Sequence, residues 1–183
     1  MAKLTASRKG LVIIYTGEGK GKTTAAIGLA VRAAGYKRRV AIVQFVKTWF
    51  TGEKAGFEGL ADYVEFTQAG KGFYQILGDK LPPEEHRRAA AAAFELAKQK
   101  VESNQYGVVI LDEIIGTVVG GLLPLETLLA LIDRKPEDVD LVLTGRHADT
   151  LPGLIDRADL VTEMVKVKHP YDMGVIARKS IDY

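Results

Sequence analysis

TGEGKGKTT, residues 16–24, directly follows the apolar run LVIIY at 11–15 and leads into the alanine-rich segment TTAAIGLAVRAAG at 23–35. The nine residues include three glycines, two lysines and three threonines, so they offer few side chains to a packed core. An apolar run, a glycine-rich loop and a helix in this order are typical of an anion-binding loop. In such a loop backbone N–H groups surround the anion, and the helix N-terminus adds partial positive charge. The stretch therefore predicts a strand, a phosphate-binding loop and a helix.

The loop matches the end of the Walker A pattern G-x-x-x-x-G-K-[ST], with Gly21, Lys22 and Thr23 as its last three members. Thr16 occupies the first consensus glycine position, and Gly17 stands one place late. Lys22 would place a charge beside the phosphates, and the Thr23 hydroxyl would bind Mg²⁺. The alternative, a flexible surface turn, requires neither the strand nor the helix. We expect nucleotide phosphates to bind Thr16, Gly17, Glu18, Gly19, Lys20, Gly21, Lys22, Thr23 and Thr24.

A pair of acids follows another apolar run. In VVILDE, residues 108–113, the run ends in Asp112 and Glu113, where a Walker B acid binds or orients Mg²⁺ opposite the loop threonine. The alternative is that both acids complement the dipole at the start of a helix. Beside a phosphate loop the metal interpretation is favoured. The sequence therefore predicts a site for Mg²⁺, or Mn²⁺ in its place, formed by Thr23, Asp112 and Glu113.

Short apolar runs alternate with helical segments along the chain. Runs that are apolar on both faces are typical of buried parallel strands, and their alternation with helices predicts a sheet covered on both sides. We therefore expect an open, mainly parallel α/β sheet with helices on both faces, like that of P-loop NTPases. Strands are expected at 11–15, 39–45, 63–66, 108–112 and 140–144, with a last one at 159–167 nearer an edge, and helices at 23–35, 82–103 and 124–135.

Composition indicates one soluble domain. The 183 residues are 47% hydrophobic and 26% charged, so residues 1–183 are expected to form one domain, with residues 1–9 as a flexible N-terminal arm. The net charge is +2 with no long block of either sign, which argues against a nucleic-acid partner. The absence of cysteine excludes disulfides and thiolate chemistry. No segment reaches the roughly 18 apolar residues of a membrane span, so we expect a cytoplasmic protein.

The loop alone does not identify which bond of the nucleotide breaks. The same cradle serves hydrolases, kinases, and enzymes that use the whole triphosphate as a leaving group. One interpretation is a small-molecule kinase or ATPase, in which an arginine lid would come from Arg38 and Arg39 or from Arg87 and Arg88. Another is an ATP-binding regulatory module that contacts a partner through residues 69–80 and the C-terminal tail.

Further motifs follow the loop in a specific order: TGEGKGKTTAAIGLAVRAAGY, VAIVQFVK, VVILDE, LPLE, VLTGRHAD, DLVTEM, VKHPYD and the C-terminal IDY. This order closely resembles the corrinoid ATP adenosyltransferases of cobalamin biosynthesis and salvage, the P-loop type of cob(I)yrinic acid a,c-diamide adenosyltransferase. The resemblance extends from about Gly10 to Tyr183. Generic P-loop proteins share the loop and the VVILDE run, but not QF-x-K, the TGR turn, or the VKH and IDY tail.

The resemblance implies a homodimer that acts on ATP and a corrinoid. Co(I), obtained from Co(II) with an electron from a reduced flavoprotein, would attack the 5′ carbon of ATP. The adenosyl group would move to cobalt, and triphosphate would leave. Because negative charge develops on the leaving oxygen, donors of the loop would stabilise the transition state. In this interpretation Lys22, Thr23 and Glu113 are the catalytic residues.

Aromatic side chains are implied on the corrinoid side. Family members enclose one face of the Co(II) corrinoid with aromatic residues, which removes the lower axial ligand and eases reduction. In QAGKGFYQIL, Phe73 falls on one such position, whereas Gln75 falls on the second and Tyr74 lies beside it. Phe73 and Tyr74 are expected to contact the corrinoid, with ordinary packing as the alternative. Arg146, in VLTGRHAD at a strand end, is expected to bind the nucleotide or the corrinoid.

Four other residues complete the expectations. Trp49 and Phe50, after the second strand, would also cover a planar ligand. His86 and His147 are interpreted as surface residues, because the spacing of the three histidines does not suit a zinc site.

Overall fold

The structure is a computed structural model that describes residues 9–47, 50–72, 74, 79 and 81–183. Within this part, six strands form a parallel sheet in the order β3-β2-β4-β5-β1-β6. The strands are β1 (Val12–Thr16), β2 (Val40–Gln44), β3 (Val64–Gln68), β4 (Val108–Asp112), β5 (Asp140–Thr144) and β6 (Leu160–Glu163). The helices are α1 (Lys22–Gly35), α2 (Gly52–Gly56), α3 (Pro83–Glu102), α4 (Ile114–Val119) and α5 (Leu125–Arg134). Short 3₁₀ turns are η1 (Glu58–Leu60), η2 (Ala148–Thr150), η3 (Ile155–Arg157) and η4 (Pro170–Met173).

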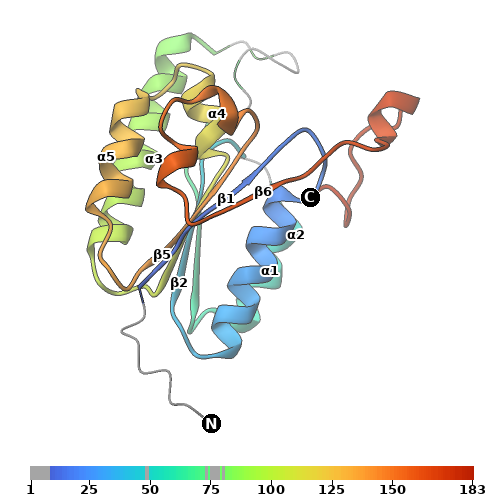
Figure 1. The fold of residues 1–183 in the computed structure, drawn as a ribbon. Helices are drawn as coiled ribbons and strands as arrows, with labels where there is room; N and C mark the ends of the chain where they lie inside the picture. The colour runs from blue at the N-terminus through green and yellow to red at the C-terminus, as the bar shows by residue number, and fades with distance from the viewer. Residues whose placement is uncertain (1–8, 48–49, 73, 75–78, 80) are drawn as a thin grey trace.

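The sheet lies between two layers of helices (Figure 1). Successive side chains of a strand point to opposite faces. In β4, Val109 and Leu111 therefore pack in the cluster that includes residues of α3, α4 and α5, whereas Ile110 packs with the alanines of α1. Small residues at the helix–sheet contact, such as Ala30 and Ala97, let the helices approach closely. The predicted open α/β sheet with helices on both faces is confirmed.

The other predicted strands and helices are confirmed to within two residues at each end, but the last strand is shorter than predicted. β6 ends at Glu163, whereas the alternating pattern predicted a strand to residue 167. β6 is an edge strand that pairs with β1, and its last partner is Thr16. Beyond Thr16 the chain enters the glycine-rich loop, so β6 has no strand left to pair with.

The parallel arrangement brings the carboxyl ends of the strands to one edge of the sheet. The glycine-rich loop follows β1, Gln44 ends β2, Asp112 ends β4 and Thr144 ends β5. Helix α4, which the sequence analysis did not predict, begins directly after Glu113 at the same edge. Ligands of open α/β sheets bind at this edge, so the loop and the acid pair lie where a shared site requires them.

Arg38 lies at the opposite edge, among the starts of the strands. Its Nη1 donates to Asp140 Oδ2 at 2.6 Å, and its Nη2 donates to the Gly107 carbonyl oxygen at 2.6 Å. Asp140 Oδ1 in turn accepts the Leu11 N–H at 2.8 Å. Arg38 therefore ties β5 to its neighbours and does not form the arginine lid of the kinase interpretation.

Within the described part of the chain, no helix combines the length and apolar character needed to cross a membrane. The expected N-terminal arm lies outside the described residues, except for Lys9. Its flexibility and the single-domain organisation of residues 1–183 stay predictions.

Leu141→Ala should lower the free energy of unfolding by about 3 kcal/mol, because the leucine is fully buried in β5 between β1 and β4. Urea denaturation monitored by circular dichroism measures this loss. Val161→Ala provides the control on the edge strand β6, where the side chain is 41% exposed, and should cost less than about 1 kcal/mol. Equal losses in the two variants would contradict this strand order.

Candidate functional site

The loop between β1 and α1 packs against the chain that follows β6. Gly17 has a φ of 98°, and a Cβ there would lie 2.6 Å from the Met164 carbonyl oxygen, so a larger residue does not fit. The Gly19 N–H donates to the same oxygen at 2.6 Å. Thr16, at the consensus glycine position, is buried, and its Oγ1 accepts the Ala148 N–H at 3.2 Å. This packing explains why the first glycine stands one place late.

Lys22 turns back into the loop. Its Nζ donates to the carbonyl oxygens of Gly17 at 2.6 Å and Gly19 at 2.8 Å, and its side chain is buried. Burial lowers the pKa of Lys22, although the negative charge of Glu113 opposes this shift. The ammonium group therefore lies inside the curve of the loop, where a phosphate group would offer it stronger acceptors than the two carbonyls.

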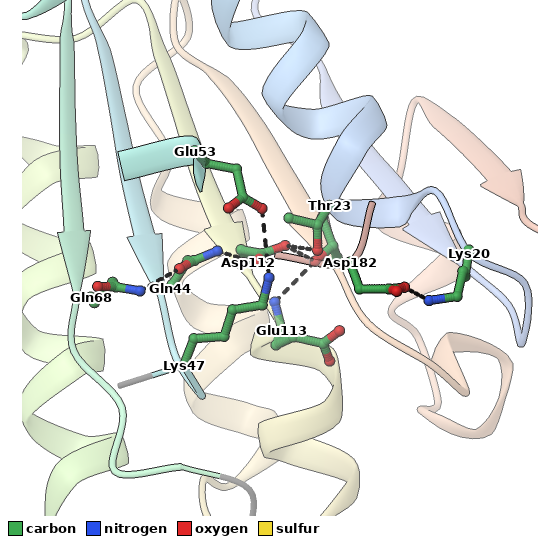
Figure 2. Close-up of polar contacts among 10 residues, drawn as sticks. Lys20, Thr23, Gln44, Lys47, Glu53, Gln68, Asp112, Glu113 and Asp182 are labelled. Atoms are coloured by element: carbon green, nitrogen blue, oxygen red, sulfur yellow. Dashed lines mark hydrogen bonds and ion pairs between the residues drawn. The ribbon is translucent and has the colours of Figure 1, made fainter. Parts of the chain in front are cut away.

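A buried carboxylate connects the loop to the sheet (Figure 2). Asp112 is 2% exposed, and its Oδ1 accepts hydrogen bonds from Thr23 Oγ1 at 2.9 Å and Thr144 Oγ1 at 2.7 Å. Its Oδ2 accepts from Gln44 Nε2 at 3.0 Å, and Gln44 Oε1 accepts from Gln68 Nε2 at 3.3 Å. One chain of hydrogen bonds thus joins β3, β2, β4, β5 and α1. It holds the Thr23 hydroxyl at the start of α1.

Glu113 stands at a sharp change of direction between β4 and α4. Its φ of 64° is left-handed, a costly conformation for a residue with a Cβ, and its N–H donates to Thr144 Oγ1 at 2.9 Å. Burial raises the pKa of the Glu113 carboxyl, and the negative charge of Asp112 raises it further. A cation bound beside this carboxyl would reverse the shift, because it would stabilise the ionised form.

A cavity of about 460 Å³ lies over the loop, and we call it the loop cavity. Seven of the nine predicted loop residues, Glu18 to Thr24, line it, together with Glu113 and Arg146. Thr16 and Gly17 support the loop from behind, through the contacts described above. Asp112 lies behind Thr23 and reaches the cavity through that hydroxyl. The predicted phosphate loop, threonine and acid pair are thus brought together.

A second cavity of about 1370 Å³ adjoins the first, and we call it the large cavity. Apolar residues of α3, α4 and the following turn form much of its wall, including Ala89, Val119 and Leu122. The two cavities share part of their lining, and the shared residues are Glu18, Glu113, Arg146 and His169. A ligand in the large cavity would therefore meet a ligand in the loop cavity at these residues.

An ion pair stands at this junction. Arg146 Nη1 lies 3.1 Å from Glu18 Oε2, and His147 Nε2 lies 3.4 Å from Glu18 Oε1. All three side chains are about half exposed, which agrees with the interpretation of His147 as a surface residue. The predicted ligand-binding residue Arg146 therefore reaches both cavities.

Tyr74 lines the large cavity with its ring centroid 5.2 Å from that of His86. The interpretation of His86 as a surface residue is wrong, because this side chain is 3% exposed and its Nε2 lies 2.9 Å from Asp79 Oδ2. His86 occupies the first turn of α3 on the side that faces the cavity. Phe50 is 65% exposed. The predictions for Trp49, Phe73 and Gln75 lie outside the described residues.

Several residues of the site were missed in the sequence analysis. Gln44 carried a usable signal, because a buried amide at the end of the apolar strand VAIVQF needs a hydrogen-bonding partner. Thr144 and Gln68 end neighbouring strands in the same way. Residues 180–183 line the loop cavity, and no local pattern indicated this.

The chain is similar to known proteins over almost its whole length. A profile of the family described as ATP:corrinoid adenosyltransferase BtuR/CobO/CobP matches residues 8–183. The chain belongs to this family. It is 36% identical over 176 residues to the corrinoid adenosyltransferase of Pseudomonas aeruginosa, spanning 96% of this chain and 84% of that one. It is 37% identical over 178 residues to the corrinoid adenosyltransferase of Escherichia coli K12 and to CobA of Salmonella typhimurium LT2, covering 96% of this chain and 86% of each relative.

Membership of the corrinoid adenosyltransferase family confirms the resemblance that the sequence motifs indicated, and it disfavours the kinase or ATPase interpretation. It also explains why a small polar cavity and a larger, more apolar one adjoin, since the family name refers to two substrates of different size and polarity.

The donor set suits Mg²⁺ in the loop cavity. Mg²⁺ binds through one or two protein oxygens, with phosphate oxygens and water completing six ligands. Thr23 and Glu113 line the cavity and offer such oxygens. The described residues contain no cluster of three or more His, Cys, Asp or Glu side chains arranged for a metal.

Glu113→Gln should remove a pH dependence of stability. Because the folded state raises the pKa of Glu113 above the ordinary value of 4.5, the folded protein holds this proton more tightly than the unfolded chain does. The stabilising contribution is complete below about pH 4.5 and is lost as the pH rises through the raised pKa. The free energy of unfolding of the wild type, minus that of the variant, should therefore fall as the pH rises from about 4 to 8.

Urea denaturation at several pH values with EDTA present measures this difference. Glu95→Gln, at an exposed position of α3, gives the background for a glutamate substitution. A wild-type minus Glu113→Gln difference that rises with pH would contradict the raised pKa.

Proposed function

We propose that this protein transfers the 5′-deoxyadenosyl group of ATP to Co(I) of a corrinoid, either cobalamin or cob(I)yrinic acid a,c-diamide, and releases triphosphate. The observation that carries the proposal is the junction of the two cavities in a member of the ATP:corrinoid adenosyltransferase family. The loop cavity suits a triphosphate, and the large cavity suits a broad, partly apolar macrocycle. The relatives, which are corrinoid adenosyltransferases, support the same reaction.

The reaction requires stabilisation of a leaving group and no general base. The cobalt electron pair forms the bond to the 5′ carbon, and the bond between that carbon and the triphosphate oxygen breaks, with its electrons leaving on oxygen. Lys22, which two loop carbonyls hold in place, and the loop N–H groups would stabilise this charge. Lys22 would exchange its two carbonyl partners for phosphate oxygens.

We further propose that Thr23 and Glu113 hold Mg²⁺ and that Asp112 orients the Thr23 hydroxyl. Asp112 Oδ1 already accepts from Thr23 and Thr144, which supports an orienting function for this carboxylate. When bound, the metal would supply positive charge to the triphosphate, with Mn²⁺ as a substitute. The position of Glu113 beside Thr23 in the lining of the loop cavity supports its assignment.

The corrinoid would occupy the large cavity, with its cobalt directed toward the junction residues Glu18, Glu113, Arg146 and His169. Tyr74 lines this cavity, which supports the proposal that it covers one face of the corrinoid together with Phe73. Arg146 would bind either substrate at the junction.

The quaternary structure and the electron donor are also proposals. The family resemblance supports a homodimer and a reduced flavoprotein that supplies the electron for Co(II). The exposed edge strand β6, with Leu160 and Val161 each 41% exposed, supports an association through this part of the surface.

An anaerobic assay tests the reaction. Purified protein is mixed with Mg-ATP and chemically reduced cobalamin or cob(I)yrinic acid a,c-diamide, while Co(I) absorbance and phosphate products are followed. The proposal predicts a light-sensitive alkyl-cobalt product together with intact triphosphate. Diphosphate or orthophosphate formation without Co(I) consumption would instead favour a kinase or ATPase.

Lys22→Ala should reduce kcat by at least about 100-fold, because it removes a donor from the charge that develops on the leaving oxygen. Steady-state kinetics with prereduced corrinoid measure the loss, and circular dichroism checks that the fold is retained. Arg88→Ala, on the exposed face of α3, serves as the charge control. A Lys22→Ala rate close to that of the wild type would refute the leaving-group function.

Tyr74→Ala and Phe73→Ala should slow the reaction from Co(II) more than the reaction from prereduced Co(I). The aromatic cover is proposed to favour loss of the lower axial ligand, which matters before reduction and not after it. Rates from both starting states are compared by the appearance of the alkyl-cobalt spectrum. Tyr36→Ala, with a side chain 81% exposed, is the control. Equal losses from Co(II) and Co(I) would make these aromatic residues packing residues only.

A further inference from the structure

Among the described residues that line the loop cavity, the cationic side chains of lysine and arginine are all engaged with acceptors of the protein itself. Lys22 is held by two loop carbonyls. The other three pair with carboxylates: Lys20 with Asp182, Lys47 with Glu53 at 3.6 Å, and Arg146 with Glu18 at 3.1 Å. The lining contains four basic residues (Lys20, Lys22, Lys47, Arg146) and four acidic residues (Glu18, Glu53, Glu113, Asp182), so their formal charges cancel.

Asp182 differs from the other carboxylates because it reaches the loop from the far end of the chain (Figure 2). Its side chain is 11% exposed, whereas its partner Lys20 is 46% exposed. Asp182 Oδ2 accepts the Arg178 N–H at 2.7 Å, which closes a turn that presents the other carboxylate oxygen to Lys20. A carboxylate is therefore fixed against a lysine of the phosphate loop.

The C-terminal tail, residues 175–183, carries Asp182 and is weakly attached to the rest of the protein. Residues 171–181 are exposed, and among the described residues the hydrogen bonds of 175–183 join the tail to itself or to η4. Among the described residues, no hydrogen bond joins 175–183 to a strand, and none of these residues belongs to the buried core. The Lys20–Asp182 pair is thus a contact that a ligand can displace at low cost.

We propose that Asp182 competes with the triphosphate group for Lys20 and so lowers the affinity of the loop cavity for triphosphate. This inference rests on the proposed function, in which the loop binds the triphosphate of ATP and retains it briefly as the product. A carboxylate paired with Lys20 occupies the cation that a phosphate group would otherwise bind. The return of Asp182 to Lys20 would therefore assist release of the triphosphate product.

Asp182→Asn tests the inference in the full-length protein. The asparagine side chain keeps an oxygen that can accept the Arg178 N–H, so the turn is retained while the charge is lost. Isothermal titration calorimetry with inorganic tripolyphosphate and Mg²⁺ should show a Kd about three- to tenfold lower than in the wild type. The difference should shrink as the ionic strength rises, because salt screens a partly exposed charge.

Two further variants make the measurement specific. Lys20→Gln should bind tripolyphosphate more weakly, and adding Asp182→Asn to it should give little further change, because the lysine for which Asp182 competes is gone. Asp133→Asn removes the same charge from the exposed ion pair between Asp133 of α5 and Arg157 of η3, and it should leave the Kd unchanged.

The outcomes separate the inference from the proposed function. A wild type that binds tripolyphosphate, with Asp182→Asn binding equally or more weakly, overturns the competition and leaves the proposed function standing. A gain in Asp182→Asn that persists in the Lys20→Gln background also overturns it. Absence of tripolyphosphate binding in both proteins overturns the assignment of the phosphate site, and the inference falls with it.

Discussion

The buried carboxylate of Asp112 is the interaction on which the site depends. Three donors from three other elements satisfy its two oxygens: Thr23 of α1, Thr144 of β5 and Gln44 of β2. A buried ionised group is tolerated only when it is paired in this way. The loop, the central strands and the first helix are therefore held in register, and the Thr23 hydroxyl is oriented before any ligand arrives.

The two cavities follow from this arrangement. Because β4 ends at Asp112, the chain turns at Glu113 in a left-handed conformation and begins α4, which forms a wall of the large cavity. The Glu113 side chain is left at the junction, where both cavities share it. One short segment thus contacts the glycine-rich loop through Asp112 and forms part of the wall of the large cavity.

Local sequence patterns predicted most of the strands and helices of the fold. Strands that are buried on both faces, such as 108–112 and 140–144, were predicted with the observed bounds, because short apolar runs rich in β-branched residues favour a strand over a helix. The end of β6 was not predictable, since it depends on where its partner β1 stops. The burial of His86 was missed for a similar reason: its neighbours Tyr74 and Asp79 come from a segment outside its helix.

The sequence alone was sufficient for the α/β class and the family, and for the position of the glycine-rich loop and the acid pair at strand ends, because each depends on residues close together or on motifs in a set order. The tertiary structure was needed to show which charged and polar side chains contact each other. Gln44, Gln68 and Thr144 join the hydrogen-bond network around Asp112 from three different strands. Asp182 meets Lys20 of the loop from the other end of the chain. Such contacts depend on strand order and on the path of the tail, and these arise from packing of the whole chain.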